Sequence, residues 1–331
     1  MNPATRALRA ACALVALVLA LPVLAQARDA AARYPDRPVR LVVPFGAGSG
    51  PDVRTRQLGQ KLAEAWGQSV IVENRPGAGG QLAMEQVARA APDGYTLVMA
   101  GQSPMAIAPH LAKLRYDPLK DFAPVTRTSK GAIVLVVNPQ LPVRTVAELV
   151  EHASRNPDRL HAASWGTATV THLALELFTR AVGVRITHVP YRAAAQAVGE
   201  LVAGEVQLAF DFYPAIGPQV KAGRLRAIAV SGRERLPALP EVPTFTEAGV
   251  REMETLSGWQ GVAAPARTPR AIVDRIQAAV ARALALPDVR ASYTDSGFDT
   301  VGDTPEEFAA FIRAEYARWG KVIAEAGIRV E

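Results

Sequence analysis

Short apolar runs alternate with amphipathic segments through the first hundred residues of the chain. Residues 39–45, 69–73 and 96–100 are typical of strands, while residues 49–66 and 81–90 have the pattern of helices between them. This alternation builds a parallel sheet with helices on its faces. The beginning of the chain is therefore predicted to be an α/β unit.

The same alternation returns in the middle of the chain. The predicted strands are residues 133–138, 160–164, 185–189, 206–212 and 225–230. The predicted helices are residues 145–154, 171–182 and 193–203. The length of 331 residues, at roughly 150 residues a domain, agrees with two domains. We therefore expect two similar α/β units rather than one continuous sheet.

The last part of the sequence is predicted to be helical after an ordered linker. Residues 233–249 are rich in Pro, Glu and Gly, and a long amphipathic helix follows from Thr268-Pro269 to Leu286. Thr304-Pro305-Glu306-Glu307 has the order of a capping box and predicts a helix to Ala326. If this tail packs back on the first unit, the first domain is discontinuous. The predicted domains are residues 28–130 and 236–331 for the first, including the linker, and residues 131–235 for the second.

The N-terminus has the pattern of a secretory signal. Arg6 and Arg9 precede an uncharged apolar run over residues 10–24, and Ala25-Gln26-Ala27 supplies small residues for a peptidase. A membrane-spanning helix needs about 20 residues, so the run is short for an uncleaved anchor, which stays open as the alternative. We expect residues 1–27 to be a signal peptide, cleavage near Ala27, and a periplasmic mature protein that has lost its only cysteine, Cys12.

Composition and spacing argue against several classes of function. The net charge of +6 arises from 37 basic and 31 acidic residues that do not gather into a stripe, and aromatic residues are 6%, so we expect no nucleic-acid partner. The five histidines lack the spacings of a zinc site. No Gly-x-Ser-x-Gly motif is present. We therefore expect no metal, no cofactor, no catalytic residue and no enzyme.

A glycine-rich junction, Gly46-Ala47-Gly48-Ser49-Gly50, joins the first predicted strand to its helix. Backbone N–H groups converge on anions at such places. No Gly-Lys-Ser/Thr follows, so the junction is not a phosphate-binding P-loop, and Pro51 occupies the third glycine position of a dinucleotide fingerprint. It is either an anion-binding loop or a plain tight turn.

A second junction in the middle unit reads Ser164-Trp165-Gly166-Thr167-Ala168-Thr169-Val170-Thr171-His172. Open α/β sheets bind ligands outside the carboxyl ends of their strands, so both junctions can face one crevice and hold a carboxylate between two helix N-termini. His172 is a candidate ligand residue or a structural histidine. Asp211 lies in the apolar run 208–212 and needs a partner, so it serves the crevice or holds a loop.

The order and spacing of several short motifs resemble those of the Bug receptors, the extracytoplasmic solute receptors of tripartite tricarboxylate transport systems. The resemblance runs from about Tyr34 to the end of the chain. The shared motifs are Tyr34-Pro35 with Arg37-Pro38, Val43-Pro44-Phe45 with Ala47-Gly48 and Asp52, Val72-Glu73-Asn74-Arg75-Pro76-Gly77-Ala78-Gly79-Gly80, Pro92-Asp93-Gly94-Tyr95-Thr96-Leu97, His188-Val189-Pro190-Tyr191, Val242-Pro243-Thr244 with Glu247-Ala248-Gly249, and Trp259 with Ala264-Pro265 and Thr268-Pro269.

The resemblance implies a two-domain, type II-like periplasmic-binding-protein fold of the Venus-flytrap kind. It also implies a small organic acid or amino-acid-like ligand held in the cleft by amides, hydroxyls and waters. The residues that it places in the ligand site are Phe45, Ala47, Gly48, Ser49, Gly50, Gln102, Ser103, Ser164, Gly166, Thr167, Thr171, His172, Tyr191 and Asp211. Ser49 and Ala168 stand where the family commonly has glycine, and both add a Cβ beside the anion site.

These features predict a monomeric solute receptor that delivers a carboxylated ligand to the permease components of a tripartite tricarboxylate-type transporter. Two alternatives use the same cleft. One is a periplasmic sensor that passes the closed state to a membrane kinase. The other is a periplasmic enzyme, which would require a histidine or carboxylate dyad within hydrogen-bond reach.

Overall fold

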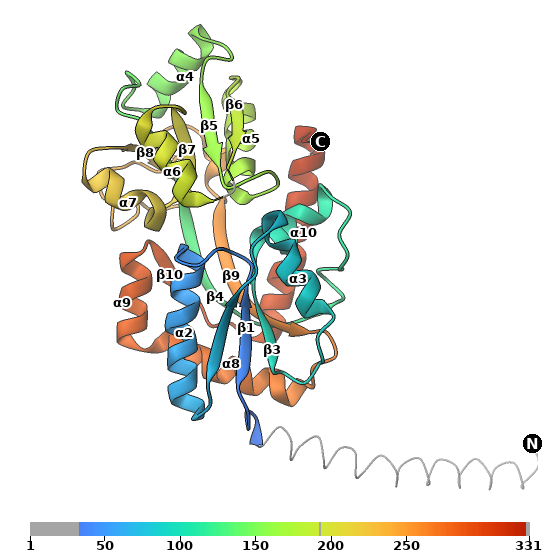
Figure 1. Cartoon of the computed structure of the whole chain (residues 1–331). Coiled ribbons are helices and arrows are strands. Elements are labelled where there is room, and N and C mark those ends of the chain that lie inside the picture. The colour runs from blue at the N-terminus through green and yellow to red at the C-terminus, as the bar shows by residue number, and fades with distance from the viewer. Residues whose placement is uncertain (1–32, 192, 329–331) are drawn as a thin grey trace, which may run out of the picture.

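The computed structural model describes residues 33–191 and 193–328 (Figure 1). The predicted signal peptide, residues 1–27, and its cleavage point near Ala27 lie outside the described residues. Among the residues that are described, no helix combines the length and the apolar character needed to span a bilayer.

The first unit begins with a small parallel sheet. Strand β1 (Val39–Val43) lies between β2 (Val70–Asn74) and β3 (Thr96–Gly101) and is parallel to both. Successive residues of a strand point to opposite faces. One face therefore buries Leu41 against helix α2 (Gly50–Trp66), and the other buries Val42 in the cluster that contains α3 (Gln81–Ala88). Three short helical turns complete this region: η1 (Ala78–Gly80) directly precedes α3, and η2 (Ser103–Ile107) and η3 (Ala108–His110) follow β3.

The parallel sheet predicted for the first hundred residues is confirmed for β1, β2 and β3, but later strands extend it in the antiparallel sense. Strand β9 (Ser257–Pro265) lies between β3 and β4 (Phe122–Val137) and is antiparallel to both. Strand β10 (Phe298–Thr300) also pairs with β4 in the antiparallel sense. The partners of β9 are more than a hundred residues distant in sequence, so local periodicity carries no sign of this pairing.

The second unit repeats the α/β pattern. Its strand β5 (His161–Ser164) is parallel to β6 (Thr187–Pro190) and β7 (Leu208–Phe212). Both β7 and β8 (Arg226–Val230) pair antiparallel with β4. The helices of this unit are α4 (Val146–Arg155), α5 (Val170–Val182), α6 (Ala194–Ala203) and α7 (Tyr213–Lys221).

Strand β4 runs through both units, as the long central strand in Figure 1 shows. It pairs with β9 from Phe122 to Ala132, and with β7 from Ile133 to Val137. The ladder of strands is therefore continuous, β2-β1-β3-β9-β4-β7-β5-β6, and the expectation of two separate sheets is wrong. The two α/β units exist, but they share one strand.

The segment between β8 and β9 packs against the second unit. Phe245 lies 6.1 Å from Phe210 with nearly parallel rings, and Val230 forms a bridge with Thr244. The short turn η4 (Arg251–Met253) ends this stretch. We predicted a domain boundary at residue 235, and these contacts lead us to propose that the second domain extends to Leu256.

Three helices return the chain to the first unit: α8 (Arg270–Ala285), α9 (Pro287–Asp295) and α10 (Pro305–Ala326). The predicted capping box at the start of α10 is confirmed, because the Thr304 hydroxyl accepts from Glu307 N at 3.2 Å and the Glu307 carboxylate accepts from Thr304 N at 2.9 Å. In Figure 1 α10 runs beside the first unit, where Trp319 is fully buried.

Candidate functional site

The first junction is a tight loop closed by its own helix cap. Ser49 Oγ accepts from Asp52 N at 3.4 Å and donates to Gly46 O at 2.7 Å. Gly48 has φ +76°, a conformation that glycine adopts without strain. Ala47 and Gly48 are exposed, and Phe45, Ser49 and Gly50 are partly buried, so the loop presents its backbone to solvent at the start of α2.

Asp52, a residue that is 2% exposed, holds this loop in place. It accepts from Gly48 N and from Asn74 Nδ2, each at 2.8 Å, and from Arg56 Nε at 3.1 Å. The same Asn74 amide donates to Phe45 O at 3.0 Å. Burial alone raises the pKa of Asp52, but these donors outweigh burial and hold the pKa below its usual value. In the sequence Asp52 is only one member of a shared motif, whereas in the structure it supports the first junction.

The second junction is held by hydroxyl groups inside the loop. Thr169 caps α5, accepting from His172 N at 3.4 Å and donating to Gly166 O at 2.7 Å. Thr171 Oγ1 accepts from Trp165 N at 3.2 Å. Ala168 has φ +61°, which is uncommon for a residue with a Cβ. Thr167 is exposed at the tip of this loop.

Two stacked histidines lie beneath the second junction. The rings of His172 and His188 are 3.9 Å apart and nearly parallel. His172 Nδ1 accepts from Ala168 N at 3.3 Å, and its Nε2 lies 3.5 Å from Glu176 Oε1. Burial first, and then the neighbouring His172, lower the pKa of His188 to about 4, so His188 is neutral at pH 7. The contacts of His172 with Ala168 N and with Glu176 are those of a structural histidine.

Ser164 and His188 form a hydroxyl–imidazole pair. Ser164 Oγ lies 2.6 Å from His188 Nε2 and also within 3.2 Å of both the N and the O of Gly166. Ser164 is 2% exposed, and Tyr191 N donates to Ser164 O at 2.9 Å. Because a nucleophile must reach its substrate, this buried geometry suits loop support better than covalent chemistry.

Asp211 supports the same loop through its tryptophan. Its Oδ2 accepts from Trp165 Nε1 at 2.9 Å and its Oδ1 accepts from Phe212 N at 2.6 Å. Asp211 is buried, and desolvation raises its pKa to about 7. Phe212 lies 5.7 Å from Trp165 and 5.4 Å from Phe298 of the first unit. Asp211 thus has loop-holding contacts close to the boundary between the units.

The structure brings two of the predicted site residues of the first unit close to the second unit. Ser103 Oγ accepts from Val170 N, the first amide of α5, at 3.2 Å. Gly50 lies beside Pro214 of α7, since a Cβ on Gly50 would be 3.7 Å from Pro214 Cβ. Gln102 instead turns toward α10 and donates to Glu315 Oε2 at 3.1 Å. Among the described residues, no hydrogen bond joins the first junction directly to the second.

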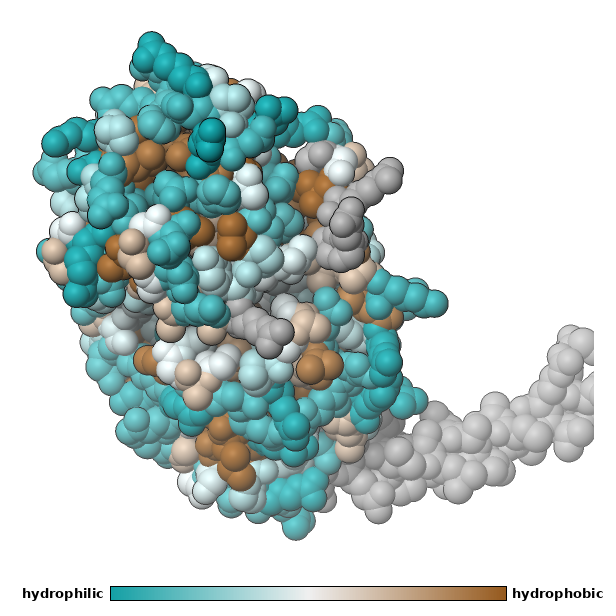
Figure 2. Space-filling model, turned by 45° about the horizontal axis from the view of Figure 1, so that its top comes forward, coloured by the Kyte–Doolittle hydropathy of each residue, from teal (hydrophilic) through white to brown (hydrophobic). Residues whose placement is uncertain are grey.

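The surface along the boundary of the two units differs from the rest. Figure 2 shows mostly hydrophilic residues over the two lobes and paler ones along the band between them.

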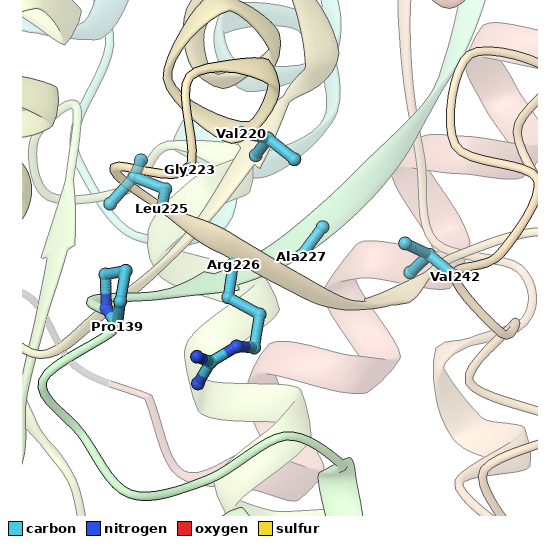
Figure 3. Close-up of a pocket in the computed structure, with 7 residues that line it drawn as sticks. All are labelled: Pro139, Val220, Gly223, Leu225, Arg226, Ala227 and Val242. Carbon is cyan, nitrogen blue, oxygen red and sulfur yellow. The ribbon is translucent and has the colours of Figure 1, made fainter.

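A cavity of about 300 Å³ lies elsewhere, on the second unit beside β8 (Figure 3). Pro139, Leu225 and Val242 line it, and Arg226 at its edge donates to Val143 O, so it is remote from both junctions. Within the described part of the chain, no cluster of three or more histidine, cysteine or acidic side chains could hold a metal ion.

Comparison with known proteins agrees with this geometry. Residues 54–328 match the family described as the tripartite tricarboxylate transporter family receptor. The chain belongs to this family. A relative from Pseudomonas sp. strain P51, the UPF0065 protein in the tcbD-tcbE intergenic region, is 38% identical over 293 residues, which cover 88% of this chain and 87% of the relative.

Solved structures of the receptor family share the fold. Rpa4515 of R. palustris, solved with adipate, is 36% identical, with a TM-score of 0.85 over 89% of this chain and 99% of its own. The periplasmic binding protein BugD is 31% identical, with a TM-score of 0.83 over 90% of this chain and 100% of its own. The resemblance to Bug receptors and the two-domain periplasmic-binding-protein fold are confirmed, and family membership indicates a periplasmic protein.

Proposed function

We propose that this receptor binds a small carboxylated ligand between its two domains and delivers it to the membrane permease of a tripartite tricarboxylate-type transporter. The observation that carries the proposal is the Ser103–Val170 hydrogen bond of 3.2 Å, which joins the first domain to the first turn of α5. Helix N-termini attract carboxylates, and domain interfaces are favoured ligand sites. The adipate in the related Rpa4515 structure supports a carboxylate as the ligand.

The predicted site residues divide by exposure. Ala47 and Gly48 of the first loop and Thr167 of the second are exposed, and we propose them as groups that touch the ligand. The buried members, Ser164 and Asp211 among them, have protein partners, and we propose that they hold the loops. Closure of the two domains would then bury the ligand and present one surface to the permease.

A thermal-shift screen with aliphatic diacids, tricarboxylates, acidic amino acids, aromatic acids and neutral sugars tests the proposal. A ligand at a hundred times its dissociation constant stabilises the folded state by about 2.7 kcal/mol, so a binding acid raises the melting temperature measurably. A shift with a neutral sugar and with no carboxylate would overturn the assignment to anions. Loss of uptake of the identified acid by cells that lack this receptor would support delivery to a permease.

An enzymatic use of the same site has one observation in its favour, the 2.6 Å approach of Ser164 Oγ to His188 Nε2. The burial of Ser164 stands against it. Mass spectrometry of each binding acid after incubation with the receptor separates the two functions. We expect every acid to be recovered unchanged, whereas a product that disappears in the Ser164→Ala variant would establish an enzyme.

A further inference from the structure

Helix α2 carries an arginine on its buried face. Arg54 is 6% exposed, whereas its apolar neighbour Val53 is 56% exposed. Arg54 Nε and Nη2 both donate to Gln260 Oε1, at 3.3 Å and 2.8 Å. The guanidinium lies 3.8 Å from the centre of the Phe298 ring, close enough for a cation–π contact.

This guanidinium has no anionic partner in the described part of the chain. No carboxylate there lies within 4.0 Å of it, and nearby Asp52 is occupied by Arg56, Asn74 and the Gly48 amide. Burial lowers the pKa of Arg54 to about 10, which leaves the group charged at neutral pH. Buried charges in proteins are normally paired, because an unpaired one is costly. An anion from outside the chain would supply the partner that the Arg54 guanidinium does not have among the described residues.

The free end of the guanidinium lies at the boundary of the two domains. A Cβ on Gly50, the first residue of α2, would be 3.3 Å from Arg54 Nη1 and 3.7 Å from Pro214 Cβ in the first turn of α7. Pro214 also lines a cavity of about 670 Å³ between α7 and α9. Nη1 therefore sits where the starts of α2 and α7 meet.

Neighbouring groups fix the direction of Arg54. Its Nε and Nη2 are committed to the Gln260 carbonyl, and the Phe298 ring covers one face, while Nη1 donates to no described residue. The Gln260 Nε2 atom is also buried without a hydrogen-bond partner among the described groups. The side chain is thus held with one donor directed to the boundary.

We infer that Arg54 is a specificity-determining residue of the ligand site, supplying through Nη1 a fixed positive charge for an anionic end of the ligand. This inference rests on the proposed function. A ligand with carboxylates at both ends could use the amides of the loops at one end and Arg54 at the other. A charge-assisted hydrogen bond is stronger than a neutral one, so the receptor should prefer a diacid to its monoester.

Isothermal titration calorimetry with adipate and monomethyl adipate tests this assignment. We expect the wild-type protein to bind adipate about tenfold or more tightly than the monoester. Arg54→Met, which keeps apolar packing on Phe298, should lose most of this preference, and Arg54→Lys should retain part of it. Arg155→Gln removes an exposed charge on α4 and serves as the control with the wild-type preference.

The calorimetry can disprove the role of Arg54 without disproving carboxylate binding by the receptor. If Arg54→Met keeps the wild-type preference, or weakens both probes equally, Arg54 does not select for charge. If the wild-type protein binds both probes equally, the assignment of Arg54 also fails while the receptor function stands. If the wild-type protein binds no carboxylate of the wider screen, the receptor function fails and the inference fails with it. Circular dichroism of each variant confirms that it is folded.

Discussion

Ser103 Oγ accepts a hydrogen bond from the Val170 amide at 3.2 Å and so ties the first domain to the first turn of α5. The bond occupies an amide that has no partner within its own helix. Because the bond connects the two domains directly, it favours the arrangement in which they are in contact at this point. We expect the population of a closed state to depend on this side chain.

Replacement of Ser103 by alanine should open the receptor. A hydrogen bond of this kind contributes about 0.5–1.5 kcal/mol, so affinity for a carboxylate should fall by roughly two- to tenfold if the closed state binds. Small-angle X-ray scattering of the unliganded variant should show a larger radius of gyration. Ser154→Ala, which removes an exposed hydroxyl bond on α4, is the control. An unchanged radius and affinity would contradict the role of the bond.

Asp52→Ala should loosen the first junction. The change removes the acceptor of Gly48 N, Asn74 Nδ2 and Arg56 Nε, and hydrogen bonds to a charged group contribute about 1.5–3 kcal/mol. We expect the free energy of unfolding in urea to fall by about 2–3 kcal/mol and ligand affinity to fall with it. Glu151→Ala removes an exposed acid on α4 and should leave both quantities close to wild type. Equal effects of the two substitutions would rule out a special role for Asp52.

Asp211→Asn should change how stability depends on pH. Burial raises the pKa of Asp211 from 3.8 to about 7, so between these values the folded protein holds a proton that the unfolded chain has released. The contribution of Asp211 is therefore complete below about pH 4 and is lost as pH rises to about 7. The stability of wild type relative to Asp211→Asn, from urea unfolding at several pH values, should fall across this window. A constant difference would show that Asp211 does not titrate there.

His188→Gln should show that the contribution of His188 to stability changes with pH in the opposite direction to that of Asp211. Burial, and then the neighbouring His172, lower the pKa of His188 from 6.5 to about 4, so the unfolded chain binds a proton that the folded protein excludes. This contribution is complete above about pH 6.5 and is lost as pH falls to about 4. The stability of wild type relative to His188→Gln, measured by the same urea titrations, should rise as the pH is raised from about 4 to about 6.5. If it falls instead, His188 is charged in the folded state.

Local signals in the sequence predicted the helix starts well. Ser49, Thr145 and Thr304 each accept a backbone N–H at the predicted start of a helix. Capping depends on residues within one turn, which is why the sequence alone identifies it. Helix α7 was not predicted, because Pro214 and Pro218 interrupt the helical pattern of residues 213–221.

Long-range pairing and burial could not be predicted in the same way. Strand β9 is set by its pairing with β3 and β4, and β4 itself includes the polar run from Thr126 to Lys130. The burial of Arg54 depends on Gln260 and Phe298, both more than two hundred residues away. The loop-holding roles of Asp52 and Asp211 likewise follow from partners that only the folded chain brings together.

The shared strand β4 has a consequence for how the protein folds and unfolds. Residues Phe122–Ala132 complete the sheet of the first domain, and Ile133–Val137 complete that of the second. Neither domain could be excised with its sheet intact, and melting of one would fray an edge of the other. We therefore expect the two domains to unfold in chemical denaturant as one cooperative unit, with a single transition seen by all probes.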